Sequence, residues 1–272
     1  GEDGCLLDAS GMPVMMPWEA QLMEAHALEF AKHCTGGAVL NVGFGCGYID
    51  GFLQKHCRPS QHFIIEAHGD VLSKVDAAGW PSKPGVRILR GKWQDMLGGL
   101  PSQSLDAIFY DTHDEGVQEF LVVAQEAKRL LRSSPSGSPG LFSYFNGFEF
   151  TNLYRHVAYC GGVAKCLTEH VGFGTATFRR IGVDFQNTDW RSWKAKGLRY
   201  WNFGAYFLPL LYLTQPPQEP SSSSEGDASH EEHRTLITAK GDGAVVSHLG
   251  RQSDLATWMV QGIERAIQEH ES

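Results

Sequence analysis

A glycine-rich segment, VLNVGFGCGYID at residues 39–50, has the residue types of a ligand-binding turn. Its apolar start is followed by Gly43, Gly45 and Gly47, and glycine lets a ligand approach the backbone closely because it has no Cβ. Farther along the chain, Glu66 ends a second apolar run, where a carboxylate is well placed to accept hydrogen bonds from ribose hydroxyls. These residues together predict a nucleoside site.

Two other phosphate-binding turns do not fit this segment. A dinucleotide fingerprint needs a glycine at the sixth position of G-x-G-x-x-G, where Tyr48 stands. A P-loop needs a GK[ST] sequence, which does not follow here. A nucleoside without a pyrophosphate fits better, and S-adenosylmethionine is the ligand that we expect. A purely structural turn between a strand and a helix is the alternative.

Apolar runs and helical stretches alternate around this turn. The expected strands are 38–44, 62–67, 86–91, 105–112 and 141–146, and the expected helices are 17–34, 48–56, 70–79 and 116–131. Continuous apolar strands separated by helices indicate a parallel sheet that is covered on both faces. Crossovers between such strands are right-handed, so we expect an α/β fold with a doubly wound, mostly parallel sheet.

The pattern changes after the fifth expected strand. A helical stretch is followed by two apolar segments, 174–185 and 204–214, which are typical of an antiparallel closing pair. We therefore expect one domain over 1–214. The Pro-, Ser- and Glu-rich segment 215–233 is predicted to be a disordered linker, and 234–272 a C-terminal extension with a helix.

Bulk properties exclude several classes of function. A formal net charge of −8 argues against direct nucleic-acid binding. The sequence contains no run of about 18 apolar residues, so no membrane span is predicted. The first residues lack the pattern of a secretory signal. His230 and His233 lie in the Ser- and Glu-rich run, so no metal site is expected there. The cysteines lack metal or disulfide spacing and predict free thiols in the cytoplasm or nucleus: Cys5, Cys34, Cys46, Cys57, Cys160 and Cys166.

Five motifs occur in an order that resembles a known enzyme family. They are MMPWEAQLM, VLNVGFGCGYID, FIIEAH, GKWQD and AIFYDTHDE. The set resembles the guanidinoacetate methyltransferase superfamily, and it looks closest to the protein-arginine branch, the fungal and plant-type arginine N5-methyltransferases. The resemblance runs from about Leu6 to Thr214 and implies a class I S-adenosylmethionine-dependent methyltransferase fold. In such a domain the N-terminal helix would cover the site.

The resemblance implies a cofactor role for each matching residue. The methionine part of S-adenosyl-L-methionine would lie on the backbone around Gly43, Phe44, Gly45, Cys46, Gly47, Tyr48 and Ile49. Ribose would meet Glu66, with Ala67 and His68 at the same edge, and adenine would meet Trp93 and Gln94. Met23 would line the pocket near the sulfonium, and Trp18 would close it. Cys46 departs from the family pattern, because a larger apolar residue is common at its position.

Glu19 and Asp111 match the family's carboxylates that grip a guanidinium group, and Asp111 would also border the cofactor. A guanidinium has a pKa above about 12, so none of its nitrogens is a ready nucleophile. Two carboxylates would hold it by charge-assisted hydrogen bonds and align one nitrogen for attack. Asp111 is the expected proton acceptor, because it ends a strand at the ligand-binding edge of an open sheet.

Simpler interpretations of the same residues stay open. Asp111 would cap a helix that begins near Asp114, Glu19 would be a first-turn acid favoured by the helix dipole, and Trp93 would be a core residue. His113 lies next to the expected site and would be a base, a substrate-facing polar residue or a surface histidine, and one of the last two is expected. Asn146 ends the fifth expected strand, and whether it contacts the backbone of the substrate stays open. The segment 187–203, rich in tryptophan and basic residues, would be a lid, a docking surface or a partly buried connection.

The leading function that the resemblance implies is methylation of the internal δ nitrogen (N5) of arginine in a protein, with a ribosomal protein as a substrate class. Two alternatives remain: a small-molecule guanidino methyltransferase of the guanidinoacetate type, and a non-catalytic cofactor-binding interaction module. No metal is expected, because S-adenosylmethionine already carries an activated methyl group.

Overall fold

The computed structural model describes residues 6–11, 13–113, 115–133, 138–149, 152–185, 201, 204–214 and 235–240. The predicted linker at 215–233 and the predicted C-terminal helix lie outside these residues. In the described part of the chain, every helix is too short or too polar to cross a membrane.

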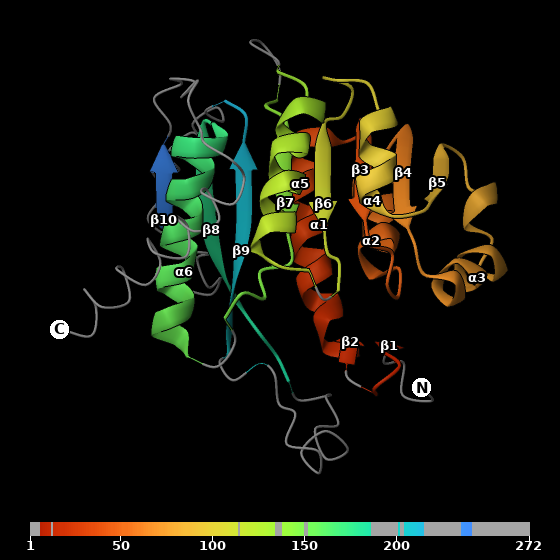
Figure 1. Cartoon of the computed structure of the whole chain (residues 1–272), viewed down its shortest axis with the longest axis horizontal. Helices are drawn as coiled ribbons and strands as arrows, with labels where there is room; N and C mark the ends of the chain where they lie inside the picture. Colours follow the sequence, from red (N-terminus) through yellow and green to blue (C-terminus); the bar gives the residue numbers. More distant parts are fainter. Residues whose placement is uncertain are drawn as a thin grey trace, which may run out of the picture.

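A mixed sheet organises the described residues, in the strand order β10-β8-β9-β7-β6-β3-β4-β5 (Figure 1). Its parallel strands are β3 (Ala38–Val42), β4 (Gln61–Glu66), β5 (Val86–Arg90), β6 (Ala107–Tyr110) and β7 (Leu141–Tyr144). Its antiparallel strands are β8 (Thr175–Gly182), β9 (Ala205–Tyr212) and β10 (Thr235–Lys240). The predicted doubly wound, mostly parallel sheet with an antiparallel closing pair is confirmed.

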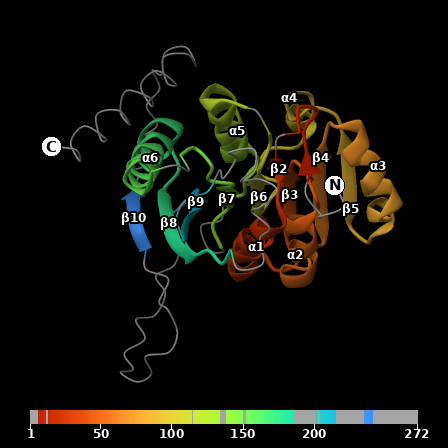
Figure 2. The same ribbon diagram turned by 90° about the horizontal axis from the view of Figure 1, so that it is seen from below.

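Helices cover both faces of this sheet (Figure 2). The longer ones are α1 (Ala20–Cys34), α2 (Tyr48–His56), α3 (Gly69–Ala77), α5 (Val117–Leu130) and α6 (Leu153–Cys166). Shorter ones are η1 (Pro17–Glu19), η2 (Trp80–Ser82), α4 (Trp93–Met96), η3 (Leu97–Gly99) and η4 (Leu167–Val171), a π-helical turn. The expected helices at 17–34, 48–56, 70–79 and 116–131 therefore form, with shifts of a few residues at most.

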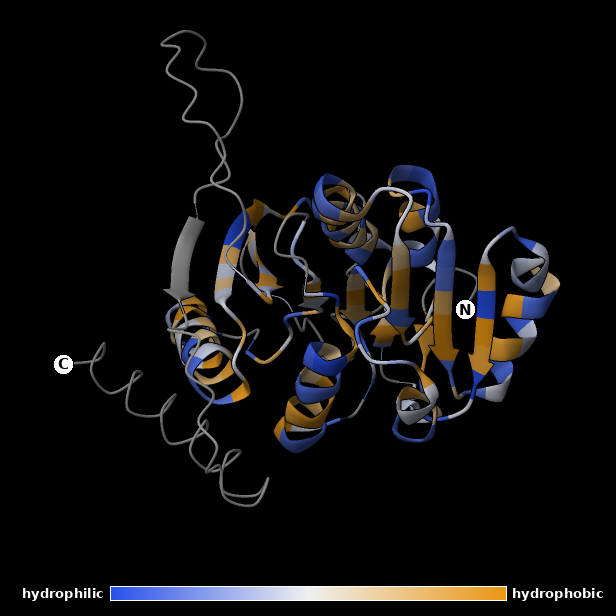
Figure 3. Cartoon of the chain, turned by 90° about the horizontal axis from the view of Figure 1, so that it is seen from above, coloured by the Kyte–Doolittle hydropathy of each residue, from blue (hydrophilic) through white to orange (hydrophobic). Residues whose placement is uncertain are grey.

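The core is divided by the sheet. The side chains of β3 are buried on both faces: Leu40 belongs to the core cluster that includes residues of α5 and α6, and Val39 belongs to the cluster that includes residues of α1 and α2. Figure 3 shows the apolar residues concentrated along the strands and on one side of each helix. This burial explains why the central strands are continuous apolar runs, as the sequence predicted.

Two features were not expected from the sequence. Strand β10 lies within the predicted extension and pairs antiparallel with β8, so part of that extension adds to the sheet. The N-terminal residues form a small hairpin of β1 (Leu6–Leu7) and β2 (Pro13–Met15) before η1 begins.

Candidate active site

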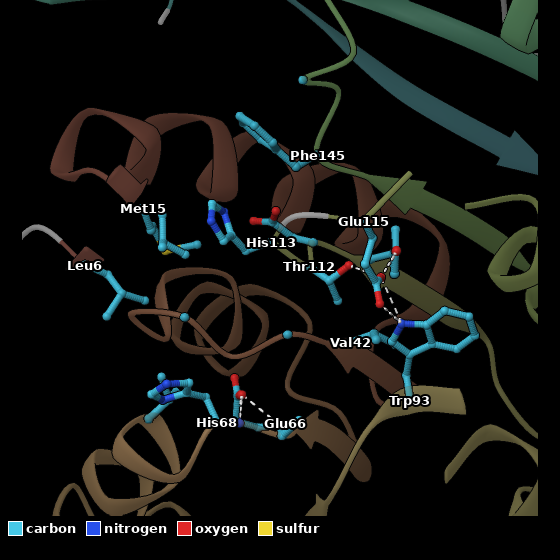
Figure 4. A pocket seen from close by; sticks show the side chains of 18 of the residues that line it. Leu6, Met15, Val42, Glu66, His68, Trp93, Thr112, His113, Glu115 and Phe145 are labelled. Carbon is cyan, nitrogen blue, oxygen red and sulfur yellow. Dashed lines mark hydrogen bonds between the residues drawn. The ribbon is translucent and has the colours of Figure 1, made fainter. Parts of the chain in front are cut away.

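A cavity of about 750 Å³ opens where β3, β4 and β6 end. Its wall includes Val42, Glu66 and Asp111, which lie at or just beyond the carboxyl ends of these three strands. Ligands of open α/β sheets bind at this edge, where neighbouring strands connect in opposite directions. The hairpin contributes Leu6 and Met15 to the wall (Figure 4).

The turn after β3 needs glycine for a geometric reason. Gly43 has φ 95°, and a Cβ there would lie 2.0 Å from the carbonyl oxygen of Asp111. Gly45 has φ 57°, and its Cβ would lie 2.9 Å from Cε of Met15. A side chain at either position would strain the backbone and displace a cavity-lining neighbour. The glycine turn that the sequence singled out therefore packs closely against the backbone of Asp111.

A buried polar network holds this turn from behind. Asn41 Nδ2 donates to the Gly43 carbonyl oxygen at 2.9 Å and to Asp50 Oδ2 at 2.8 Å. Asp50 and His62 are both fully buried, with Oδ1 and Nε2 3.0 Å apart. Burial raises the pKa of Asp50, and the hydrogen bond from His62 opposes that effect. The members of this network lie on β3, α2 and β4, so sequence spacing alone does not reveal it.

Glu66 connects the turn to the end of β4. Its Oε2 accepts a hydrogen bond from the backbone N–H of Phe44 at 3.0 Å. Its Oε1 accepts from the N–H groups of Ala67 at 2.8 Å and His68 at 2.7 Å. A carboxylate offers about four lone-pair positions, so capacity for another donor remains. Glu66 faces the cavity and is thus a fixed acceptor for a ligand hydroxyl.

Asp111 and Glu19 lie on the wall of this one cavity, although they are far apart in sequence. Part of the Asp111 surface faces the cavity, but surrounding protein keeps the carboxyl from bulk water, and this desolvation raises its pKa to about 7. Glu19 is 2% exposed, and its Oε1 accepts from the backbone N–H of Met16 at 2.7 Å. Glu19 can therefore be both an acidic residue at the start of the N-terminal helix, as the simpler interpretation has it, and a residue of the cavity wall.

The alternative role of Asp111 as a helix cap is not seen. Helix α5 begins at Val117 with Gly116 as its N-cap, and the N–H of Gly116 donates to Glu119 Oε2 at 3.2 Å. The backbone N–H of Asp111 instead donates to the carbonyl oxygen of Val42 at 2.9 Å, continuing the pairing of β6 with β3.

Trp93 and Gln94 begin α4 and line the side of the cavity that the sequence assigned to adenine. Trp93 is 5% exposed, so it is a core residue and a wall residue together. Its indole Nε1 donates to both carboxylate oxygens of Glu115, at 2.7 and 2.9 Å. Glu115 is the last residue of the motif AIFYDTHDE, yet the sequence analysis gave it no role.

The comparison with known families decides the class of protein. The sequence profile described as guanidinoacetate N-methyltransferase matches residues 2–208. The chain belongs to this family. The chain is similar to proteins named protein arginine N-methyltransferase 2. It is 36% identical over 203 residues to the one from Yarrowia lipolytica, and the match covers 72% of this chain and 42% of the relative. To the one from Candida glabrata it is 40% identical over 219 residues, covering 77% and 50%.

The chain thus spans about half the length of these curated relatives. Solved structures show lower similarity. Spermidine synthase from Thermotoga maritima has a TM-score of 0.48 and 15% identity, covering 75% of this chain and 63% of that one. An S-adenosylmethionine-dependent methyltransferase from Mesorhizobium loti has a TM-score of 0.36 and 19% identity, covering 47% and 52%.

Several residues that were expected at the site, most from the family resemblance and Asn146 from its position at a strand end, do not line the cavity in the described structure. These are Trp18, Met23, Phe44, Cys46, Gly47, Tyr48, Ile49 and Asn146. Trp18 packs against Phe185 and Trp201, with ring centroids 5.3 and 6.1 Å apart. The side-chain amide of Asn146 lies in the core and donates to the Phe207 carbonyl oxygen at 2.9 Å. The family roles of these residues stay predictions.

Other wall residues were not expected from the sequence. Met15 covers the glycine turn, where its Sδ accepts from the backbone N–H of Cys46 at 3.3 Å. Asp8 of the hairpin lies across from His113, with Oδ2 and Nε2 3.8 Å apart. Trp201, the one described residue of 187–203, is buried and also lines the cavity; the rest of that segment lies outside the described residues.

Proposed function

We propose that the protein transfers the methyl group of S-adenosyl-L-methionine to arginine in a protein substrate, at the internal δ nitrogen. The observation that carries this proposal is that Glu19 and Asp111 both line the cavity whose wall also includes Gly43, Gly45 and Glu66. The names of the family's arginine methyltransferase relatives support it.

The described residues fit the cofactor. Gly43 and Gly45 leave backbone without side chains on the wall, and Glu66 keeps acceptor capacity for ribose hydroxyls beside them. The Trp93 indole offers a flat apolar surface on the same wall. When bound, S-adenosyl-L-methionine supplies an electrophilic methyl group on a positively charged sulfur.

Glu19 and Asp111 would prepare the nucleophile. Two acceptors on one guanidinium draw its positive charge toward the bound nitrogens and away from the attacking one. Because an opposite charge favours the ionised carboxylate, binding of the cation lowers the raised pKa of Asp111 from about 7. Asp111 would then accept the proton that the nitrogen loses as its bond to the methyl carbon forms, the carbon–sulfur bond breaks and S-adenosylhomocysteine leaves. Holding the nitrogen in line with the methyl group provides the remaining advantage.

A protein-borne arginine fits the accessible edge of the cavity. His113 exposes 45% of its side chain although it lines the cavity, so part of the wall reaches solvent. Because the family profile is named for guanidinoacetate, a small-molecule guanidino methyltransferase remains the second candidate function.

The deciding experiment supplies methyl-labelled S-adenosyl-L-methionine and a cell extract, with ribosomal proteins as the first substrate fraction to separate. Label recovered after protein hydrolysis as δ-N-methylarginine is the expected result. Label in small metabolites alone would replace the protein substrate with a small guanidino compound. Cofactor binding with no label in either fraction would favour a non-catalytic interaction module.

A further inference from the structure

Glu115 lines the cavity but takes no part in the chemistry above. Its carboxylate accepts hydrogen bonds from four side chains (Figure 4). Trp93 Nε1 donates to both oxygens at 2.7 and 2.9 Å, and Gln94 Nε2 donates to Oε1 at 3.2 Å. The hydroxyl groups of Tyr110 and Thr112 both donate to Oε2.

These donors use the acceptor capacity of the Glu115 carboxylate within the protein itself. A carboxylate has about four lone-pair positions, and the contacts with these side chains occupy them. Burial raises the pKa of Tyr110, and its hydrogen bond to Glu115 acts in the same direction, which keeps the hydroxyl a donor. Glu115 is therefore unlike Glu66, which keeps capacity for a ligand.

The donors come from two separate parts of the wall. Trp93 and Gln94 begin α4, on the side predicted to meet adenine. Tyr110 and Thr112 are the chain neighbours of Asp111, one on each side. A single carboxylate thus joins the adenine side of the wall to the backbone that carries the expected proton acceptor.

We propose that Glu115 is a positioning residue that fixes the Trp93 wall and the Asp111 backbone in one arrangement. Cofactor affinity and methyl transfer then depend on the same carboxylate, although it touches neither reactant. The methyl-transfer part of this inference rests on the proposed function, whereas the affinity part does not.

The first experiment compares Glu115→Ala with Glu115→Gln in the full chain. Affinity for S-adenosylhomocysteine is measured by calorimetry, and kcat is measured with labelled S-adenosyl-L-methionine. For Glu115→Ala we expect about tenfold weaker affinity from the lost hydrogen bonds and about hundredfold lower kcat from misplacement of Asp111. The Gln variant should recover much of both, because its amide oxygen can accept from Trp93 and its N–H groups can donate to the two hydroxyls.

The matched control is Glu126→Gln, at a half-buried position of α5. Glu126 pairs with Arg129 at 2.7 Å and lies outside the cavity wall. This variant should keep the affinity and kcat of the unchanged protein, and thermal unfolding of every variant identifies losses that come from misfolding.

A second set of variants separates the two sides without removing Glu115. Trp93→Phe should act mainly on affinity for S-adenosylhomocysteine. Tyr110→Phe combined with Thr112→Val keeps the side-chain sizes and should act mainly on kcat. When Glu115→Ala is added to this double variant, affinity for S-adenosylhomocysteine should fall, but kcat should fall no further. Independent, multiplicative losses of kcat would overturn the proposal.

A binding probe keeps the inference separate from the proposed function. N-acetyl-L-arginine amide is titrated into each variant saturated with S-adenosylhomocysteine. If the unchanged protein binds the cofactor product but methylates no guanidino compound, the proposed function fails. The probe still decides the role of Glu115, because unchanged binding of both ligands by Glu115→Ala would refute it.

Discussion

Glu66 and Asp111 occupy corresponding places beside β3, at the ends of its two parallel neighbours β4 and β6. Glu66 is held by three backbone N–H groups and also orders the glycine turn. Asp111 is governed by desolvation, which raises its pKa to about 7. In the proposed function, one carboxylate would be a fixed acceptor and the other would exchange a proton near neutral pH. The difference shows that surroundings, more than residue type, assign the two roles.

The largest test of this contrast is Asp111→Asn. An amide of the same size keeps a hydrogen-bond acceptor but cannot take a proton, so kcat should fall by about 10²–10⁴-fold. Affinity for S-adenosylhomocysteine, measured by calorimetry, should stay within about twofold, because Glu66 and the turn are untouched. Full turnover in this variant would remove Asp111 from the mechanism.

The same substitution should raise stability at alkaline pH. Because the folded-state pKa of Asp111 is about 7 and the ordinary value is 3.8, the unfolded chain loses this proton first as pH rises. Asp111 therefore costs the native state stability increasingly between pH 4 and 7, by up to about 4 kcal/mol above that range. Urea unfolding at pH 5 and pH 8 should show Asp111→Asn gaining clearly more stability relative to the unchanged protein at pH 8 than at pH 5. An equal gain at both values would contradict the desolvation account.

Glu66→Gln should have a smaller effect, directed at binding. The amide keeps one acceptor oxygen but places N–H groups against backbone donors, so affinity for S-adenosylhomocysteine should fall by about 10–100-fold. At saturating cofactor, kcat should change far less than in Asp111→Asn. A loss confined to kcat would reverse the assignment of the two carboxylates.

The smallest effect is expected at the edge of the cavity. His113 and Asp8 are 3.8 Å apart and partly exposed to solvent. Exposed pairs contribute about 0–1 kcal/mol, so His113→Ala should change the free energy of unfolding by less than about 0.5 kcal/mol. Its kcat should stay near that of the unchanged protein, as steady-state assays at neutral pH would show. A large loss of kcat would make His113 a part of the catalytic machinery.

The sequence predicted the parallel half of the fold well, because its signals are local. Buried parallel strands are continuous apolar runs, and α2 was expected over its observed range of Tyr48–His56. The two-residue strand β1 was not predicted, because so short a segment has no measurable period. Strand β10 follows the Pro-, Ser- and Glu-rich segment in sequence and joins the sheet through its pairing with β8, which sequence spacing does not reveal.

Some of the expected site residues lie on the cavity wall because of their position at strand ends. Gly43, Glu66 and Asp111 were found because each follows or ends an expected strand. Glu115 was missed because its donors belong to α4 and to the end of β6, which sequence spacing does not bring together. Asn146 shows the opposite error that position along the chain can cause. Its place at a strand end suggested a contact with substrate, but its amide is hydrogen-bonded within the core.

The network behind the glycine turn also bears on how the sheet assembles. His62 on β4 lies opposite Val39 on β3, and this register brings His62 within 3.0 Å of Asp50 on α2. A slip of one residue would turn His62 to the other face of the sheet and leave a buried carboxyl without that partner. A buried polar group left without its partner costs about 1–3 kcal/mol, a sizeable part of a domain's total stability of about 5–15 kcal/mol. The Asp50–His62 pair therefore penalises the wrong alignment of the two central strands during folding.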